Sequence, residues 1–182
     1  MLSSDVNAWF VVQVVPRHEQ KVVDRLAYKG QENFLPTSTI RRRWSDRTKR
    51  VTEPLFPGYV FCRTNRSSIG SVLRTPGVRR IVCFGGHPHP VPDGEIEAIR
   101  QVAQCGRELT PAPYVAVGQK VEIVSGPLAG VSGLVSLLKN RARLIVSVDM
   151  IMKSVSVDVA ISELALFEAE PIAGFRAQDN LM

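Results

Sequence analysis

The pattern of the sequence changes at a proline-rich stretch near the middle of the chain. Before Gly106, strand-like apolar runs alternate with helix-like spacing, whereas after Pro113 only short strand-like runs follow, separated by Gly, Pro or Lys-Asn turns. The stretch between them is too short and polar to pack on its own. With 182 residues, the chain is long enough for two cores. We therefore predict a first domain over 1–106, a linker over 107–113 and a second domain over 114–168. A disordered tail is predicted over 169–182.

The first half begins with a pattern typical of a strand followed by a helix. Trp9 to Val15 is a near-continuous run of β-branched and aromatic residues, which predicts a central strand buried on both faces. Val22, Val23 and Leu26 then recur at helical spacing, and Gly30 supplies a C-terminal stop.

The rest of the first half continues this alternation. Residues 34–62 are predicted to form two extended segments around a polar hairpin tip, and a short helix is expected over 67–73. A strand is predicted over 78–84, followed by a helix that Asp93 could cap. The expected fold class is an α/β (α+β) sandwich with a mainly antiparallel sheet.

The second half predicts a small all-β barrel. Its short strands are expected at Val121–Val124, Val131–Leu138, Arg143–Asp149 and Ser154–Val159. About 50 residues suffice for a small barrel but not for a wide ligand cavity.

Charge is distributed unevenly between the two halves. Up to Thr110 there are 17 basic and 10 acidic residues, whereas beyond it there are 6 basic and 7 acidic ones. Arg outnumbers Lys by 17 to 6, which favours bidentate contacts to phosphate or carboxylate. A polyanionic partner is therefore expected near the first domain. The slightly negative second half argues against a general RNA-binding role for the barrel.

The densest charge lies in the hairpin at residues 41–50, which carries six cations and one anion. Arginines around an aromatic side chain suit single-stranded nucleic acid, because guanidinium groups hold phosphates while the ring stacks on a base. A solvated hairpin kept soluble by charge is an equally weighted alternative. The candidate nucleic-acid-binding residues are Arg41, Arg42, Arg43, Trp44, Arg47, Lys49 and Arg50.

Several classes of protein are disfavoured. No apolar run reaches ten residues, whereas a membrane-spanning helix needs about 20. The start of the chain lacks the pattern of a secretory signal, so a cytoplasmic protein without a membrane partner is expected. The three cysteines lie far apart, and we interpret them as buried structural thiols. Cys83 with His87 and His89 is the one cluster resembling metal ligands, but it is better interpreted as a loop.

A catalytic constellation is also missing from the sequence. The acidic residues Asp93, Glu95 and Glu97 are consistent with the start of a capped helix. No other acidic pair, Ser/His/Asp set or glycine-rich phosphate loop is present. We therefore predict a protein that is not an enzyme and needs no cofactor or metal.

Three motifs occur in a specific order. Glu53 to Val60 reads Glu-Pro-Leu-Phe-Pro-Gly-Tyr-Val, and Thr75 to Val78 reads Thr-Pro-Gly-Val. The second half then carries Gly118-Gln-Lys-Val, Ser125-Gly-Pro-Leu-Ala-Gly and Gly133-Leu-Val. Together with the opening Trp9 strand, this order resembles the NusG family of transcription elongation factors, in which a NusG N-terminal domain precedes a KOW barrel of SH3-like type. The Ser-rich strands near the end look more like those of specialised UpxY-type antiterminators than like those of the housekeeping factor.

The resemblance implies an interface with RNA polymerase on the first domain, at the clamp helices of the largest polymerase subunit. The matching positions are Trp9, Phe56, Pro57, Gly58 and Tyr59, with Phe10 beside them. These aromatics could instead form the local core, and for Phe10 we favour that alternative. For Phe56 and Tyr59 we favour the interface, because a turn presents aromatics outward and interface anchors are typically aromatic.

A second polymerase contact is implied just after this strand, toward the opposite jaw. The positions concerned are Thr64, Asn65, Ser67 and Ser68, with Arg66 among them. Polar capping of the following helix is an alternative explanation for the two serines. The resemblance also places the basic hairpin at the upstream edge of the transcription bubble, where it can touch DNA.

For the barrel, the resemblance implies partners rather than chemistry, namely termination factor Rho or a ribosomal protein. Housekeeping members carry Phe-Gly-Arg at the binding edge, whereas this chain has Ile151, Met152 and Lys153. Loss of the aromatic and the glycine disfavours Rho, and the loop stays a candidate for another apolar contact.

The expected function is that of a monomeric elongation and antitermination factor that bridges the polymerase cleft and suppresses pausing or termination. A specialised, operon-specific paralogue is favoured. The alternatives are a housekeeping NusG-type factor acting with Rho, or a ribosome-associated RNA-binding KOW protein.

Overall fold

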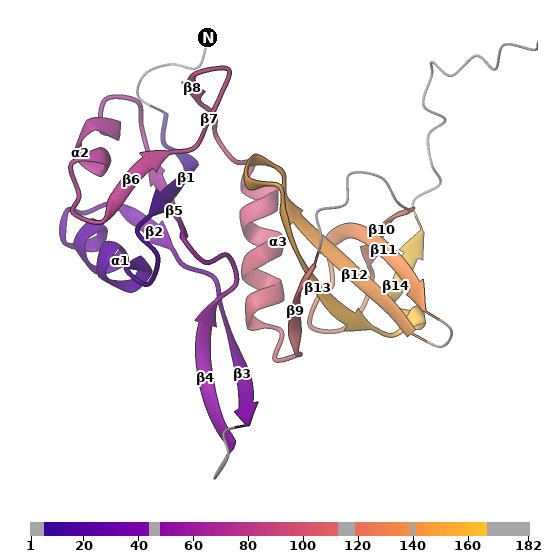
Figure 1. The fold of residues 1–182 in the computed structure, drawn as a ribbon. Helices are drawn as coiled ribbons and strands as arrows, with labels where there is room; N and C mark the ends of the chain where they lie inside the picture. The colour runs from indigo at the N-terminus through magenta and orange to yellow at the C-terminus, as the bar shows by residue number, and fades with distance from the viewer. Residues whose placement is uncertain (1–5, 44–47, 113–118, 139–140, 167–182) are drawn as a thin grey trace, which may run out of the picture.

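Figure 1 shows a computed structural model of the chain, in which a long helix lies between an N-terminal sheet and a C-terminal barrel. The structure describes residues 6–43, 48–112, 119–138 and 141–166. The hairpin tip with Trp44 and Arg47 and the tail predicted over 169–182 lie outside the described residues. Mixed α/β composition with antiparallel sheets confirms the predicted fold class.

The N-terminal sheet has four strands in the order β2-β5-β1-β6. Their bounds are Ala8–Val14 for β1, Glu32–Phe34 for β2, Tyr59–Thr64 for β5 and Val78–Ile81 for β6. Strand β1 is paired antiparallel on both sides, so the prediction of a central strand is confirmed. Its apolar residues are buried because both faces of the sheet are covered.

The α-helices form near their predicted places, at Glu19–Tyr28 for α1, Ile69–Leu73 for α2 and Asp93–Gln104 for α3. The apolar stripe of α3 consists of Ile96, Ile99 and Val102, and all three are buried. Asp93 lies in the first turn of α3 rather than at its cap, which is Pro92. It therefore acts through the helix dipole and makes no side-chain capping bond.

Two short hairpins stand apart from the main sheet. The first pairs β3 (Thr37–Arg43) with β4 (Thr48–Pro54) and projects from the body of the molecule (Figure 1). The second pairs β7 (Cys83–Phe84) with β8 (His87–Pro88). A single strand was expected over 78–84, but β6 ends at Ile81, and β7 pairs instead with β8 across a turn made by two consecutive glycines with positive φ.

The C-terminal barrel is a six-stranded sheet in the order β14-β10-β11-β12-β13-β9. The strands expected from sequence are β10 (Gln119–Ile123), β11 (Ser132–Leu138), β12 (Arg141–Val148) and β13 (Lys153–Val159). Two short 3-10 helices flank β13, at Asp149–Ile151 for η1 and Ile161–Glu163 for η2. Strand β14 (Leu164–Leu166) completes the sheet on one side.

Strand β9 (Leu109–Ala112) corrects the predicted linker. It pairs antiparallel with β13, with Leu109 opposite Val157 and Pro111 opposite Val155. Proline is tolerated there because β9 is an edge strand with one side unpaired. The stretch expected not to pack is therefore part of the barrel, and the connection after α3 is shortened accordingly.

The apolar interior forms two clusters rather than one core per domain. One cluster under α1 and α2 includes Phe10, Val12 and Leu26. The larger cluster runs from the N-terminal sheet through α3 into the barrel. The two predicted domains therefore share a continuous apolar contact around α3.

The cysteines differ from one another in exposure. Cys62 is buried as predicted, and burial raises the pKa of its thiol to about 12. Cys105 is partly buried, whereas Cys83 is exposed in the β7–β8 hairpin, where a buried thiol was expected. Within the described ranges, no helix is long and apolar enough to cross a membrane.

Candidate binding surfaces

The Phe56–Tyr59 segment forms a tight turn before β5. The backbone N–H of Tyr59 donates to the carbonyl of Phe56 at 3.1 Å, and Gly58 has a φ of 84°. Proline at the second and glycine at the third position suit a type II turn. The Gly58 carbonyl also accepts the N–H of Val14 at 2.9 Å, which joins the turn to the central strand.

A buried carboxylate holds this turn from the other side. Glu19, in the first turn of α1, is only 6% exposed, and its Oε1 accepts the backbone N–H of Gly58 at 2.8 Å. Sequence reasoning missed this residue, because an acidic side chain in a first helical turn is explained by the helix dipole alone. The Glu19 contact fixes the turn against α1.

The aromatic residues of the first predicted interface are mostly internal. Phe56 is 1% exposed and packs edge-on against Phe61, with ring centroids 6.2 Å apart. The expectation that the turn presents Phe56 outward is wrong, because the first residue of the turn still belongs to the core and only the second projects. Trp9 is also buried, and Phe10 lies in the local core as favoured. Exposed Pro57 and half-buried Tyr59 therefore form the accessible surface of this turn.

The second predicted polymerase contact includes a hydrogen-bonded turn that leads into α2. The Asn65 Oδ1 accepts the Ser67 hydroxyl at 2.7 Å and the Ser68 N–H at 2.9 Å, just before α2. Ser68, the N-cap residue of α2, makes no side-chain capping bond, and the Ser67 hydroxyl is bound by Asn65 instead. Polymerase contact by these residues stays a prediction. Thr64 is buried, yet together with Asn65 and Ser68 it lines an open polar hollow of about 500 Å³ beside Arg63.

The basic arm is the β3–β4 hairpin. Its register places Arg41 opposite Arg50 and Arg42 opposite Lys49, while Arg43 lies opposite a threonine. Basic residues directly across from each other repel unless an anion lies between them. The side chain of Arg50 is exposed. The arm therefore combines projection from the body with two cross-strand basic pairs (Figure 1).

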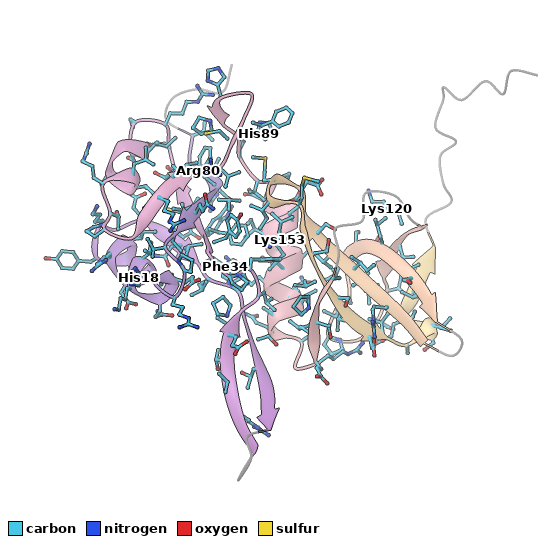
Figure 2. The ribbon with its side chains drawn as sticks, viewed as in Figure 1. His18, Phe34, Arg80, His89, Lys120 and Lys153 are labelled. Carbon is cyan, nitrogen blue, oxygen red and sulfur yellow. The ribbon has the colours of Figure 1, made fainter. Side chains whose placement is uncertain are left out.

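The loop predicted as the partner-binding edge of the barrel lies against the N-terminal domain. Ile151 is half-buried and packs on the larger apolar cluster, against which Tyr59 also packs. The Lys153 Nζ lies 6.0 Å from the centroid of the Tyr59 ring. Figure 2 labels Lys153 at this junction. Lys153 and Met152 are both exposed, and Met152, at 67%, is not part of the packing against this cluster.

An ion pair fastens the connection between the two domains to the barrel. Arg107 binds Glu163 through two contacts, at 2.6 and 3.0 Å, and also donates to the carbonyl of Asp158 at 3.1 Å. Glu163 in turn accepts the N–H of Ala160. These hydrogen bonds, of which the one from Arg107 has the largest effect, hold the pKa of Glu163 below its ordinary value.

A hollow of about 630 Å³ lies between α3 and the barrel. Gly94, Glu95 and Gln101 line it from the helix, and Asp149 and Ser147 line it from the barrel. Burial and the nearby Asp149 charge raise the pKa of Glu95 to about 7, although a backbone hydrogen bond from Asp149 opposes the shift. This contact between domains was not predictable from local sequence.

Comparisons with known proteins agree with this architecture. The family model described as transcription termination factor NusG matches residues 7–100. A Lactococcus lactis protein named transcription termination/antitermination protein NusG is 30% identical over 178 residues, which covers 90% of this chain and 95% of the relative. A Pseudomonas aeruginosa protein of the same name is 27% identical and covers 86% of this chain and 96% of its own length.

A solved structure titled "Domain interaction in Thermotoga maritima NusG" has the same fold. It superposes with a TM-score of 0.53 at 24% identity and covers 89% of this chain and 98% of its own. The family model matches more than half of the chain, and the curated relatives resemble it over nearly their full length. This chain belongs to the NusG family.

Proposed function

We propose that this protein is a transcription elongation and antitermination factor that binds RNA polymerase through the turn at Pro57 and Tyr59. In this proposal it bridges the polymerase cleft and suppresses pausing, as a specialised, operon-specific member of its family. The names of its relatives support a role in transcription termination or antitermination. The contacts of the turn support the choice of docking surface.

The observation that carries the proposal is the fixed geometry of the turn. Glu19, the β1 backbone and buried Phe56 hold it from three sides. Its exposed part therefore loses little conformational entropy on binding, which favours affinity. An exposed proline beside a half-exposed tyrosine is a surface suited to the apolar side chains of a helical partner. The clamp helices of the largest polymerase subunit are the proposed partner.

The basic arm is proposed to contact DNA at the upstream edge of the bubble. Its two cross-strand pairs of basic residues would be relieved by a phosphate lying between the strands. Because the arm projects away from the sheet, it could reach nucleic acid while the turn stays on the polymerase (Figure 1).

The barrel is proposed to recruit a further partner through the Ile151–Lys153 loop. A ribosomal protein fits better than Rho, because the loop lacks the aromatic residue and glycine of the housekeeping motif. In the arrangement that the structure shows, called closed from here on, Ile151 and Lys153 face the N-terminal domain. Both proposed surfaces would therefore become more accessible when the barrel moves away.

A pausing assay tests this function. Purified polymerase is halted at a defined pause on a template, and the pause lifetime is measured with and without the protein. We expect the wild type to shorten the lifetime and Tyr59→Ala to lose most of this effect, because an aromatic anchor is removed without emptying the core. Tyr28→Ala is the matched control, since Tyr28 is 95% exposed and lies outside the turn. An unchanged pause lifetime with the wild type at saturating concentration would reject the function.

The arm has a separate test. A variant with Arg41, Arg42 and Arg43 replaced by serine should bind a bubble template more weakly and with a flatter salt dependence. On duplex DNA, the log–log slope should fall by about 0.9 for each phosphate that the arm no longer neutralises. Unchanged slopes would leave the arm as a solvated hairpin.

A further inference from the structure

The hollow between α3 and the barrel brings together carboxylates from the two halves of the chain. Glu95 comes from the first turn of α3, and Asp149 begins the 3-10 helix that follows β12. Neither belongs to the proposed polymerase surface or to the basic arm. Their meeting depends on how the barrel lies on the helix.

The hydrogen bonding in this hollow is incomplete on the helix side. The Oε2 atom of Glu95 and the Oε1 atom of Gln101 are buried and have no hydrogen-bond partner among the described residues. A buried acceptor without a donor costs free energy that solvation would recover. Opening of the hollow would hydrate both atoms, so this side of the contact favours opening.

Charge in the hollow adds to this tendency. The charged side chains that line it are Glu95, Glu97, Asp149 and one cation, Lys120. Lys120 is exposed, and Glu97 is within 3.5 Å of Arg100 on the same helix. Burial and the charge of Asp149 both disfavour ionised Glu95, and the backbone hydrogen bond from Asp149 opposes them only in part.

The other end of α3 supplies a pivot. After Gln104 only Cys105 and Gly106 precede Arg107, which the barrel holds through Glu163. Gly106 has a φ of 72°, a conformation that glycine adopts readily. If the barrel turned as one unit with β9 attached, the change in backbone conformation would be concentrated at these two residues.

We propose that Glu95 and Asp149 form a proton-dependent latch between α3 and the barrel, closed when Glu95 is protonated and released when it ionises. Release lets the barrel rotate about Cys105–Gly106 and separates Lys153 from Tyr59. The separation of Lys153 from Tyr59 would uncover a polymerase-binding surface, and this consequence rests on the proposed function. The latch itself does not depend on the proposed function.

The direction of the pH dependence follows from linkage. The pKa of Glu95 is about 7 in the closed form and is expected near its ordinary value of 4.5 in the open form. The closed form therefore binds the proton more tightly. Its stabilisation is complete below about pH 4.5 and is lost as the pH rises through about 7. Between these values the open-to-closed ratio rises by at most about tenfold per pH unit, and by less where solvent screens the half-buried carboxylate.

Nuclear magnetic relaxation of the full chain tests the latch. Rotational correlation times are measured separately from amides of the N-terminal sheet and of the barrel, between pH 5.5 and pH 8.5. For the wild type we expect one common value at pH 5.5 and two different, shorter values at pH 8.5. Glu95→Gln cannot ionise, so it should keep one common value throughout.

A matched control and a second variant separate the latch from other effects. Glu97→Gln removes the same charge from the same helix at a more exposed position and should behave like the wild type. Asp149→Asn should bring the pKa of Glu95 in the closed form nearer its ordinary value, so the difference between pH 5.5 and pH 8.5 should shrink. Equal behaviour of Glu95→Gln and wild type, or two correlation times already at pH 5.5, would overturn the latch. No polymerase enters this experiment, so its outcome is independent of the proposed function.

Discussion

The barrel meets the two ends of α3 in different ways. At the C-terminal end, β9 and the Arg107–Glu163 pair attach the connection to the barrel with satisfied hydrogen bonds. At the N-terminal end, Glu95 faces Asp149 across a hollow in which two acceptor atoms of the helix find no donor among the described residues. The polar contacts between α3 and the barrel are thus complete at one end of the helix and incomplete at the other, although Ile96 is buried there. A contact of this kind suits rotation about the C-terminal end rather than complete separation.

Among the polar contacts between α3 and the barrel, the largest effect is expected at the Arg107–Glu163 ion pair. Arg107→Ala removes both contacts to Glu163 and takes the cation away from a largely buried carboxylate. We expect a loss of about 1–3 kcal/mol in the free energy of unfolding, below that of a fully buried pair because Arg107 is partly exposed. Denaturant unfolding followed by circular dichroism measures this loss. Arg143→Ala breaks the more exposed pair with Asp158 and should cost less than about 1 kcal/mol. Equal costs for the two variants would contradict the comparison.

A substitution at Gly126, which lies beside the ion pair, is a second way to weaken the contact between Arg107 and Glu163. A Cβ added at Gly126 would lie 2.5 Å from Glu163 Oε1, and Gly126 has a φ of 81°. Gly126→Ala should therefore displace the carboxylate from Arg107 and cost about 1–2 kcal/mol. In the Arg107→Ala background the added cost should shrink to the backbone strain alone. A double-mutant cycle by denaturant unfolding measures that difference, and full additivity would show that Gly126 acts independently of the pair.

Acid should weaken the Arg107–Glu163 ion pair, whereas it should favour the closed contact between Glu95 and Asp149. The pKa of Glu163 lies below its ordinary value of 4.5, chiefly because Arg107 donates to it. Its stabilisation is therefore present above about pH 4.5 and is lost as the pH falls through the lowered value. Thermal melts of the wild type between pH 3 and pH 6 should show this loss, and Arg107→Ala should flatten the dependence. An identical slope in both proteins would exclude Glu163 as its source.

The smallest effect is expected in the hollow. Gln101→Ala removes an acceptor that has no partner among the described residues, and it empties no packed space. The free energy of unfolding should change by less than about 0.5 kcal/mol in either direction. Ile99→Ala on the apolar stripe of the same helix is the contrasting control and should cost about 2–5 kcal/mol. A large loss in Gln101→Ala would show that the hollow is more tightly packed than its geometry indicates.

The elements of this fold were predictable because their signals are local. The apolar run of β1, the helical spacing in α1 and the barrel strands each lie within a dozen residues. Strand β9 was missed because its stability comes from β13, a partner far along the chain. Pairing of this kind leaves no signal in a short polar stretch.

The positions of the turn and of the β3–β4 arm were predictable from the sequence, but their contacts were not. The turn at Phe56–Tyr59 and the β3–β4 arm occur where the motifs indicated. The burial of Phe56 and the Glu19 contact depend on how α1 and β5 pack, which spacing does not reveal. The contact of Lys153 with Tyr59 likewise depends on the placement of whole domains.

Affinity for a transcription elongation complex tests the central claim most directly. Purified polymerase is assembled on a nucleic-acid bubble, and binding of the full chain is measured for wild type, Tyr59→Ala and the exposed control Tyr28→Ala. Loss of an anchor worth about 2 kcal/mol predicts roughly 30-fold weaker binding for Tyr59→Ala, with the control unchanged. Equal affinities for wild type and Tyr59→Ala would contradict the assignment of this turn as the docking surface.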